Sequence, residues 1–292
     1  MPIRRERPAR TRTGRKNNRN PNHRPRGMHE ARINKLPFVA AAIVIIGMFV
    51  GSIFLTKEEI NPANFCPTNR SGHGTTAILI DASDQLTNEQ SAALRAEFEN
   101  LSNPRTSDGR PLLKRGDRLA VYLLEEDYED LNKIFDMCSP GTVSERELGD
   151  RANEGENFAK LRWKRFSQNI MNKVSEPISN ASANKTSPII ESIKHIRHTE
   201  FPPSDVISDK GNFRLIIASD LLQNSGIANH YSTLPQVRQV FRQKPIDMTG
   251  IEVRLWRLNS QTHLKLQSIT HLTWWREFFA LANARLRKPK QF

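Results

Sequence analysis

The sequence predicts an α/β protein, in which a doubly wound, mostly parallel sheet is flanked by helices and preceded by one transmembrane helix and a basic tail. Beyond residue 73, short runs rich in apolar residues alternate with segments of helical periodicity. This alternation is typical of parallel strands joined by helical crossovers. A run of twenty uncharged residues at positions 36–55 predicts the membrane span. A hydrophobic content of 37% excludes wholesale disorder.

The positive charge of the chain is concentrated near its N-terminus. The formal net charge is +13, and 12 of the 44 Lys and Arg residues but two of the 31 acidic residues lie in positions 1–35. The remaining chain carries 32 basic and 29 acidic residues. We therefore expect residues 1–35 to be a disordered cytoplasmic tail that contacts anionic lipid, with nucleic acid or a cytoplasmic protein as alternative ligands. Nucleic acid is the less favoured partner, because the rest of the chain has little basic excess.

The uncharged run, LPFVAAAIVIIGMFVGSIFL, is long enough to cross a bilayer. A helix of this length spans about 30 Å, the thickness of the hydrocarbon core. We expect a retained signal anchor; a buried core helix and a cleaved signal peptide are the alternatives. Basic residues precede the run and Glu58 and Glu59 follow it. The positive-inside rule then places the N-terminus in the cytoplasm and the later residues in the periplasm of a bacterial inner membrane, with residues 56–72 as a juxtamembrane connector.

Residues 73–286 are expected to form one domain, followed by a solvated C-terminal tail at 287–292. Strands are predicted from four runs rich in apolar residues, at residues 75–82, 118–124, 213–218 and 251–258. A loop is expected between the second strand and Gly141. Thr87 and Gln90 form a capping-box pair that opens the first helix of the domain.

Four further helices are predicted from periodicity. One runs from Phe158 to about Val174, with Leu161, Phe166 and Ile170 among its inward positions. A second helix begins at residues 186–188, and a third lies around residues 234–241. The last helix lies at the C-terminal end of the domain and carries an apolar stripe of Leu272, Trp275, Phe279 and Ala282. The stripe is expected to pack on the sheet, with a partner-binding surface at residues 274–279 as the alternative.

Polar side chains follow two of the predicted strands and open a helix between them. Asp81 and Ser83 come at the end of the first strand, Thr186 precedes a helix, and Asp220 follows the third strand. In open α/β sheets, ligands bind beyond the carboxyl ends of the strands. Carboxylates and hydroxyls without His or Cys make an oxygen-only site, which suits Mg²⁺ better than zinc.

These residues resemble the metal-ion-dependent adhesion site of the von Willebrand factor type A (vWA) domain family. The family pattern is Asp-x-Ser-x-Ser after the first strand, then a Thr, then an Asp after the central strand. The resemblance covers residues 73–285 and places Asp81, Ser83, Thr186 and Asp220 at metal-site positions. Gln85 stands where the family has a second Ser, so its longer side chain changes the ligand geometry. The resemblance implies Mg²⁺-dependent recruitment of a protein partner, whose acidic side chain would complete the coordination.

Two other interpretations stay open at this point. The side chains of Asp81, Ser83 and Asp220 would also serve simply as helix and turn caps, which would make the protein a metal-independent structural anchor. A Mg²⁺-dependent hydrolase is the less favoured alternative. Haloacid-dehalogenase-type phosphatases need a second Asp where this chain has Ser83, and neither a phosphate-binding Gly-rich loop nor a Gly-x-Ser-x-Gly motif is present. We therefore expect a protein that is not an enzyme.

Cys66 and Cys138 both lie in the part of the chain that is expected outside the cytoplasm. A disulfide is the natural expectation in an oxidising compartment, and buried free thiols are the alternative. In the resembled fold, an edge or antiparallel strand between them would bring both loops to one end of the domain. A bridge there would attach the connector to the domain.

Overall fold

The computed structural model describes residues 36–55, 59–81, 83, 86–102, 112–124, 131–141, 155–179, 186–207, 212–260 and 262–292. Gln85, which was expected at the metal site, lies outside these residues. The chain divides into two compact units, residues 1–50 and residues 51–292.

A seven-stranded sheet forms the centre of the second unit, in the order β3-β2-β1-β4-β5-β6, with β7 also paired to β5. β1 (Thr75–Asp81), β2 (Arg118–Leu124), β4 (Phe213–Ser219) and β5 (Glu252–Arg257) are mutually parallel neighbours along this order. These are the four strands that the apolar runs predict. The α/β class and the mostly parallel sheet are therefore confirmed.

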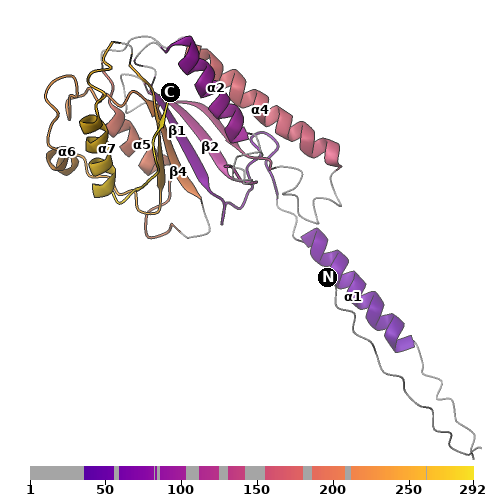
Figure 1. The fold of residues 1–292 in the computed structure, drawn as a ribbon. Coiled ribbons are helices and arrows are strands. Elements are labelled where there is room, and N and C mark those ends of the chain that lie inside the picture. Colours follow the sequence, from indigo (N-terminus) through magenta and orange to yellow (C-terminus); the bar gives the residue numbers. More distant parts are fainter. Residues whose placement is uncertain are drawn as a thin grey trace, which may run out of the picture. The chain divides into compact units, whose positions relative to one another are not determined.

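Helices cover both faces of the sheet. α2 (Asn88–Ser102) and α4 (Glu156–Ser179) lie on one face, and α5 (Ile189–Glu200), α6 (Val237–Gln243) and α7 (Ile269–Leu281) lie on the other (Figure 1). Each face of the sheet has its own hydrophobic core, and alternate residues of β1 point into one or the other. Ala77 and Leu79 pack in the core with α5 and α7, whereas Ile78 and Ile80 pack in the core with α2 and α4. This division follows from the two-residue repeat of a strand.

The second strand is followed by another strand rather than by the expected loop alone. β3 (Asn132–Cys138) pairs antiparallel with β2 at the edge of the sheet. The prediction of a loop up to Gly141 was wrong here because an edge strand keeps one face in solvent. The exposed charges of Lys133 and Asp136 hide the apolar alternation by which a strand is detected.

Two details of the helices and the C-terminus also differ from expectation. Leu161 was expected to point inward, but its side chain is 61% exposed; it lies about 140° around the helix from Phe166, which is fully buried. Residues 287–292 were expected as a solvated tail. Instead, β6 (Arg285–Leu286) and β7 (Lys290–Gln291) both pair with β5, so the sheet continues almost to the last residue.

The first unit contains most of α1 (Leu36–Leu55), a helix at the position predicted for the membrane span. Side chains are described for residues 39–51 of this helix, and large apolar groups such as Val39, Ile43 and Phe49 are exposed there. Among the residues that the structure describes, no helix is both long enough and apolar enough to span a membrane.

The predicted disulfide is present. Cys66 is bonded to Cys138, with 4.7 Å between their Cα atoms, which excludes the alternative of free thiols. Cys138 ends β3, and its backbone N–H donates to the carbonyl oxygen of Asn64. The connector is thus attached covalently and by a hydrogen bond to the edge of the sheet.

Candidate functional site

The carboxylate of Asp81 is the centre of a cluster of oxygen atoms at the carboxyl ends of β1 and β4. Ser187 and Ser219 both donate their hydroxyl hydrogens to Asp81 Oδ2, at 3.0 and 2.6 Å. The backbone N–H of Ser83 donates to Oδ1 at 3.0 Å. Because β1 and β4 are parallel neighbours, their last residues, Asp81 and Ser219, end at the same edge.

A small pocket joins this cluster to Asp220. Asp81, Ser83 and Asp220 line it and are each less than a tenth exposed, and its volume is about 10 Å³. That volume is enough for roughly one water molecule or a single ion. The remaining lining residues come from the start of α2 and from the chain after β5, namely Leu86, Gln90, Leu258, Asn259 and Ser260.

The backbone after β4 is held in an unusual conformation that places Asp220 in the pocket. Leu221 has a φ of 66°, in the left-handed region that a bulky residue rarely adopts. Its N–H donates to Ser219 Oγ at 2.7 Å, and its carbonyl oxygen accepts from Trp275 Nε1 at 2.9 Å. His271 Nε2 lies 3.0 Å from the same oxygen. Side chains of α7 therefore fix the turn on which Asp220 sits.

Gln267 supports the turn from the other side. Its side-chain amide donates to the carbonyl oxygens of Asp220 and Leu258, at 2.9 and 2.6 Å, and so links the chain ends of β4 and β5. Arg257 donates to the carbonyl oxygen of Gln267. Burial lowers the pKa of Arg257, and the charge of Asp220 opposes this shift, so a fixed positive charge lies within electrostatic reach of the site.

Behind the turn, His230 and His271 form a buried pair, and the ring of His230 contacts those of Trp274 and Trp275. Each histidine is 1% exposed, and 3.1 Å separates His230 Nδ1 from His271 Nε2. Burial lowers the pKa of His230 to about 3 and that of His271 to about 4. Both rings are therefore neutral at physiological pH.

The lowered pKa values predict that acid weakens the fold. In the unfolded chain both histidines bind a proton near pH 6.5, whereas the folded protein does not until pH 4 or below. The free energy of unfolding should thus fall as the pH drops below 6.5, by roughly 2 kcal/mol per histidine at pH 5. Urea unfolding at intervals of about half a pH unit between pH 7.5 and 5 would measure this fall in the free energy of unfolding. His230→Gln should lose about half of this pH dependence.

The matched control for this prediction is His198→Gln, which changes an exposed histidine on α5. It should keep the wild-type pH dependence. An unchanged slope in His230→Gln would contradict the assignment of the acid sensitivity to the buried pair.

The structure brings together most of the residues that the sequence pointed to. Asp81, Ser83 and Asp220 line one pocket, but the hydroxyl that reaches Asp81 from the start of α5 is that of Ser187, not its neighbour Thr186. Ser219 was also absent from the predicted ligand set. Each of these serines is the immediate sequence neighbour of a predicted ligand: Ser187 follows Thr186, and Ser219 precedes Asp220. Which of two adjacent hydroxyls turns inward depends on the backbone of the turn, which the sequence pattern does not specify.

The ligand types present at this site are carboxylates and hydroxyls. Within the described part of the chain, no three His, Cys, Asp or Glu side chains cluster as a metal site. A hydroxyl that donates its hydrogen keeps two lone pairs. Ser187 donates to Asp81, and Ser83 lines the pocket, so their oxygens suit a hard cation such as Mg²⁺, which accepts neutral oxygen ligands and retains waters.

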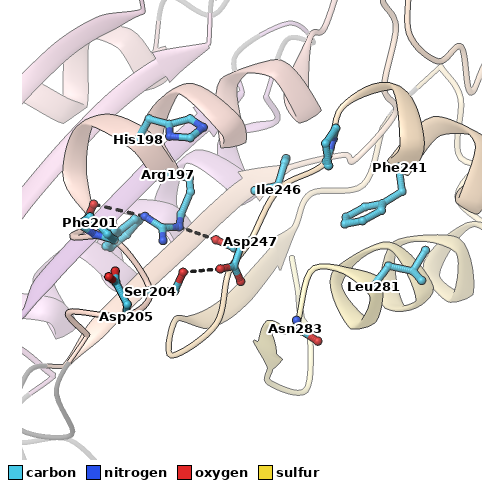
Figure 2. Close-up of a pocket in the computed structure, with 12 residues that line it drawn as sticks. Arg197, His198, Phe201, Ser204, Asp205, Phe241, Ile246, Asp247, Leu281 and Asn283 are labelled. Carbon is cyan, nitrogen blue, oxygen red and sulfur yellow. Dashed lines mark hydrogen bonds between the residues drawn. The ribbon is translucent and has the colours of Figure 1, made fainter.

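A much larger cavity, of about 690 Å³, lies near the opposite end of the sheet, among the segments that lead into β4 and β5. Arg197 lines it and donates to the carbonyl oxygens of Phe201 and Asp247 (Figure 2). It also donates to the carbonyl oxygen of Pro202. Hydrogen bonds from Ser204 and Thr249 lower the pKa of Asp247 to about 2. The side chains of Arg197, Ser204 and Asp247 are thus used in holding the walls of the cavity, and none of the residues predicted for the site lines it.

The fold and the site define an α/β domain with an oxygen-only cluster at the carboxyl edge of its sheet. No family model and no curated protein matches the chain. Among solved structures, proximal thread matrix protein 1 from the mussel byssus is similar, with 12% identity and a TM-score of 0.36 over 72% of this chain and 48% of that one. The same protein with a zinc-occupied MIDAS motif gives the same values.

An aerotolerance-related membrane protein from Bacteroides fragilis is also similar, with 10% identity and a TM-score of 0.30 over 63% of this chain and 67% of that one. The chain spans about half the length of the mussel protein structures that it matches.

Proposed function

We propose that this protein is a membrane-anchored vWA-like interaction module, which recruits or scaffolds a partner protein outside the cytoplasm through a divalent cation at the Asp81 cluster. The observation that carries this proposal is the meeting of three distant segments at one carboxylate. Asp81 from β1, Ser187 before α5 and Ser219 from β4 are joined by hydrogen bonds, with Asp220 across a pocket of single-ion size.

The residues that would hold the cation are Asp81, Ser83, Ser187 and Asp220. When bound, Mg²⁺ would supply an open coordination position for an acidic side chain of the partner. The donation of the Ser187 hydroxyl to Asp81 orients its lone pairs away from that carboxylate, and the left-handed turn at Leu221 fixes Asp220. Such an arrangement favours reversible binding over turnover, so we propose a binding protein rather than an enzyme.

The proposed anchor is residues 36–55, with the basic tail at the cytoplasmic face of a bacterial inner membrane and the sheet domain in the periplasm. The absence of charge in these twenty residues, the exposure of their apolar side chains at positions 39–50 and the basic excess before them support this topology. The Cys66–Cys138 disulfide is compatible with an oxidising compartment.

The proposal predicts that the full chain in mild detergent binds Mg²⁺ with saturable heat in a calorimetric titration. Asp81→Ala should weaken that binding by about tenfold or more. Asp205→Ala is the matched control, because Asp205 is an exposed carboxylate at the large cavity, away from the cluster, and should bind as the wild type does. Ser187→Ala provides a second, smaller change at the site for use if Asp81→Ala does not fold.

A metal-independent scaffold is the second candidate, and two observations favour it. Asp81 already accepts three hydrogen bonds, and Arg257 places positive charge near Asp220. The absence of Mg²⁺ heat from a folded wild-type protein would favour this candidate and contradict the cation-dependent one.

A further inference from the structure

We propose that the outward face of the N-terminal half of α4 rests on the anionic surface of the membrane. This inference rests on the anchoring proposed above, and it concerns a face that the site does not use. The face consists of Phe158, Lys160, Leu161, Lys164 and Arg165, which is called the α4 stripe below.

The α4 stripe combines large apolar side chains with basic ones in solvent. Phe158 is 65% exposed and Leu161 is 61% exposed, although both lie on a helix whose other face is fully buried. At three residues apart, the two side chains share one side of the helix. Exposed apolar groups beside Lys and Arg are the features by which a helix enters the headgroup region of a bilayer.

The charge of this half of α4 is complementary to anionic lipid. Lys160, Lys164 and Arg165 are exposed, and the acidic residue in the same turns is Glu156, which pairs with Lys160 at 2.6 Å. From Asn157 to Lys173 the helix contains no acidic residue. Basic side chains held close to an anionic leaflet are attracted to it, and the attraction falls off within a Debye length.

The position of the α4 stripe in the domain brings it within reach of the membrane. The guanidinium carbon of Arg165 lies 6.0 Å from the ring centroid of Phe65, next to the disulfide at Cys66. The stripe therefore lies beside the segment through which the chain passes from α1 into the domain. Residues 56–64 separate the end of α1 from Phe65, and even when fully extended they span about 30 Å. An anchored chain thus keeps this end of the domain near the lipid surface.

The test uses the full chain in nanodiscs whose lipids carry bromine near the headgroup, which quenches nearby tryptophan. The variant Leu161→Trp should gain emission that is quenched about twofold more strongly in phosphatidylcholine mixed with phosphatidylglycerol than in phosphatidylcholine alone. Replacing Lys160, Lys164 and Arg165 together with Gln in that variant should remove the difference. Gln239→Trp, on the exposed side of α6, is the control whose added emission should not be quenched in either lipid.

A third position separates this inference from the anchoring on which it rests. Ile45→Trp, at the middle of α1, is measured in a second pair of nanodiscs whose lipids carry bromine near the ends of the acyl chains, and it should be quenched in both lipids. Quenching at position 45 without quenching at position 161 would overturn the inference and leave the anchoring intact. The absence of quenching at position 45 would overturn the anchoring, and the inference with it.

Discussion

Replacing both Cys66 and Cys138 with alanine is expected to lower the free energy of unfolding by about 4 kcal/mol. The bridge joins residues 72 positions apart, and a cross-link over so long a loop strongly reduces the conformational entropy of the unfolded chain. It also holds the connector, including the buried ring of Phe65, against the edge strand β3. Urea unfolding of the full chain in mild detergent, followed by tryptophan fluorescence, measures the difference.

The control is the wild-type protein after reduction with dithiothreitol, which should match the double alanine variant. A loss of less than 1 kcal/mol in both would show that the unfolded chain is already restricted in this region, or that the connector contributes little to the fold.

Glu200→Gln is expected to cost about 3 kcal/mol of folding stability, because it removes the negative charge from a buried ionic network. The side chain of Glu200 is fully buried and lies 2.7 Å from both Arg118 Nη1 and Lys133 Nζ. It also accepts a hydrogen bond from the hydroxyl of Tyr122. Burial and this hydrogen bond raise the pKa of Tyr122 to about 12. Without the carboxylate, two cations would remain at the sheet edge with one exposed counter-charge.

Asp136→Asn is the matched control, because Asp136 pairs with the same Arg118 and Lys133. Its side chain is 37% exposed, so solvent screens the interaction and the expected loss is below about 1 kcal/mol. Equal losses in the two variants, measured by urea unfolding, would contradict the argument that burial makes the Glu200 network costly to break.

The sequence predicts the interior of this fold better than its edges. β2 matches its predicted range, β1 and β4 differ from theirs by one residue at one end, and β5 is one residue shorter at each end. Strands buried on both faces need largely apolar side chains, which makes them easy to detect. The capping box is also confirmed: Thr87 and Gln90 exchange hydrogen bonds of 3.0 and 3.1 Å. β3, β6 and β7 lie at the edge or are two residues long, so neither a repeat nor an apolar run marks them.

The candidate site was predictable at the level of strands but not of individual hydroxyls. Asp81 and Asp220 follow from the rule that polar residues at the carboxyl ends of adjacent parallel strands converge. The choice of Ser187 over Thr186 depends on a turn whose conformation is set by tertiary contacts. The contacts by which α7 holds the turn at Leu221 also depend on tertiary structure, so the sequence did not predict them. Trp275 was predicted only as a packing residue of the last helix, and nothing in the sequence singles out His271. Their contacts with the carbonyl oxygen of Leu221 are seen only in the folded structure.

The most direct test of the central claim is a crystal of the sheet domain grown or soaked with Mn²⁺, a hard cation with a strong anomalous signal that prefers the same oxygen ligands as Mg²⁺. The account predicts one anomalous peak in the pocket between Asp81, Ser83 and Asp220, within bonding distance of the Ser187 hydroxyl or a water that it holds. No peak there at saturating Mn²⁺, or a peak at other residues alone, would contradict it.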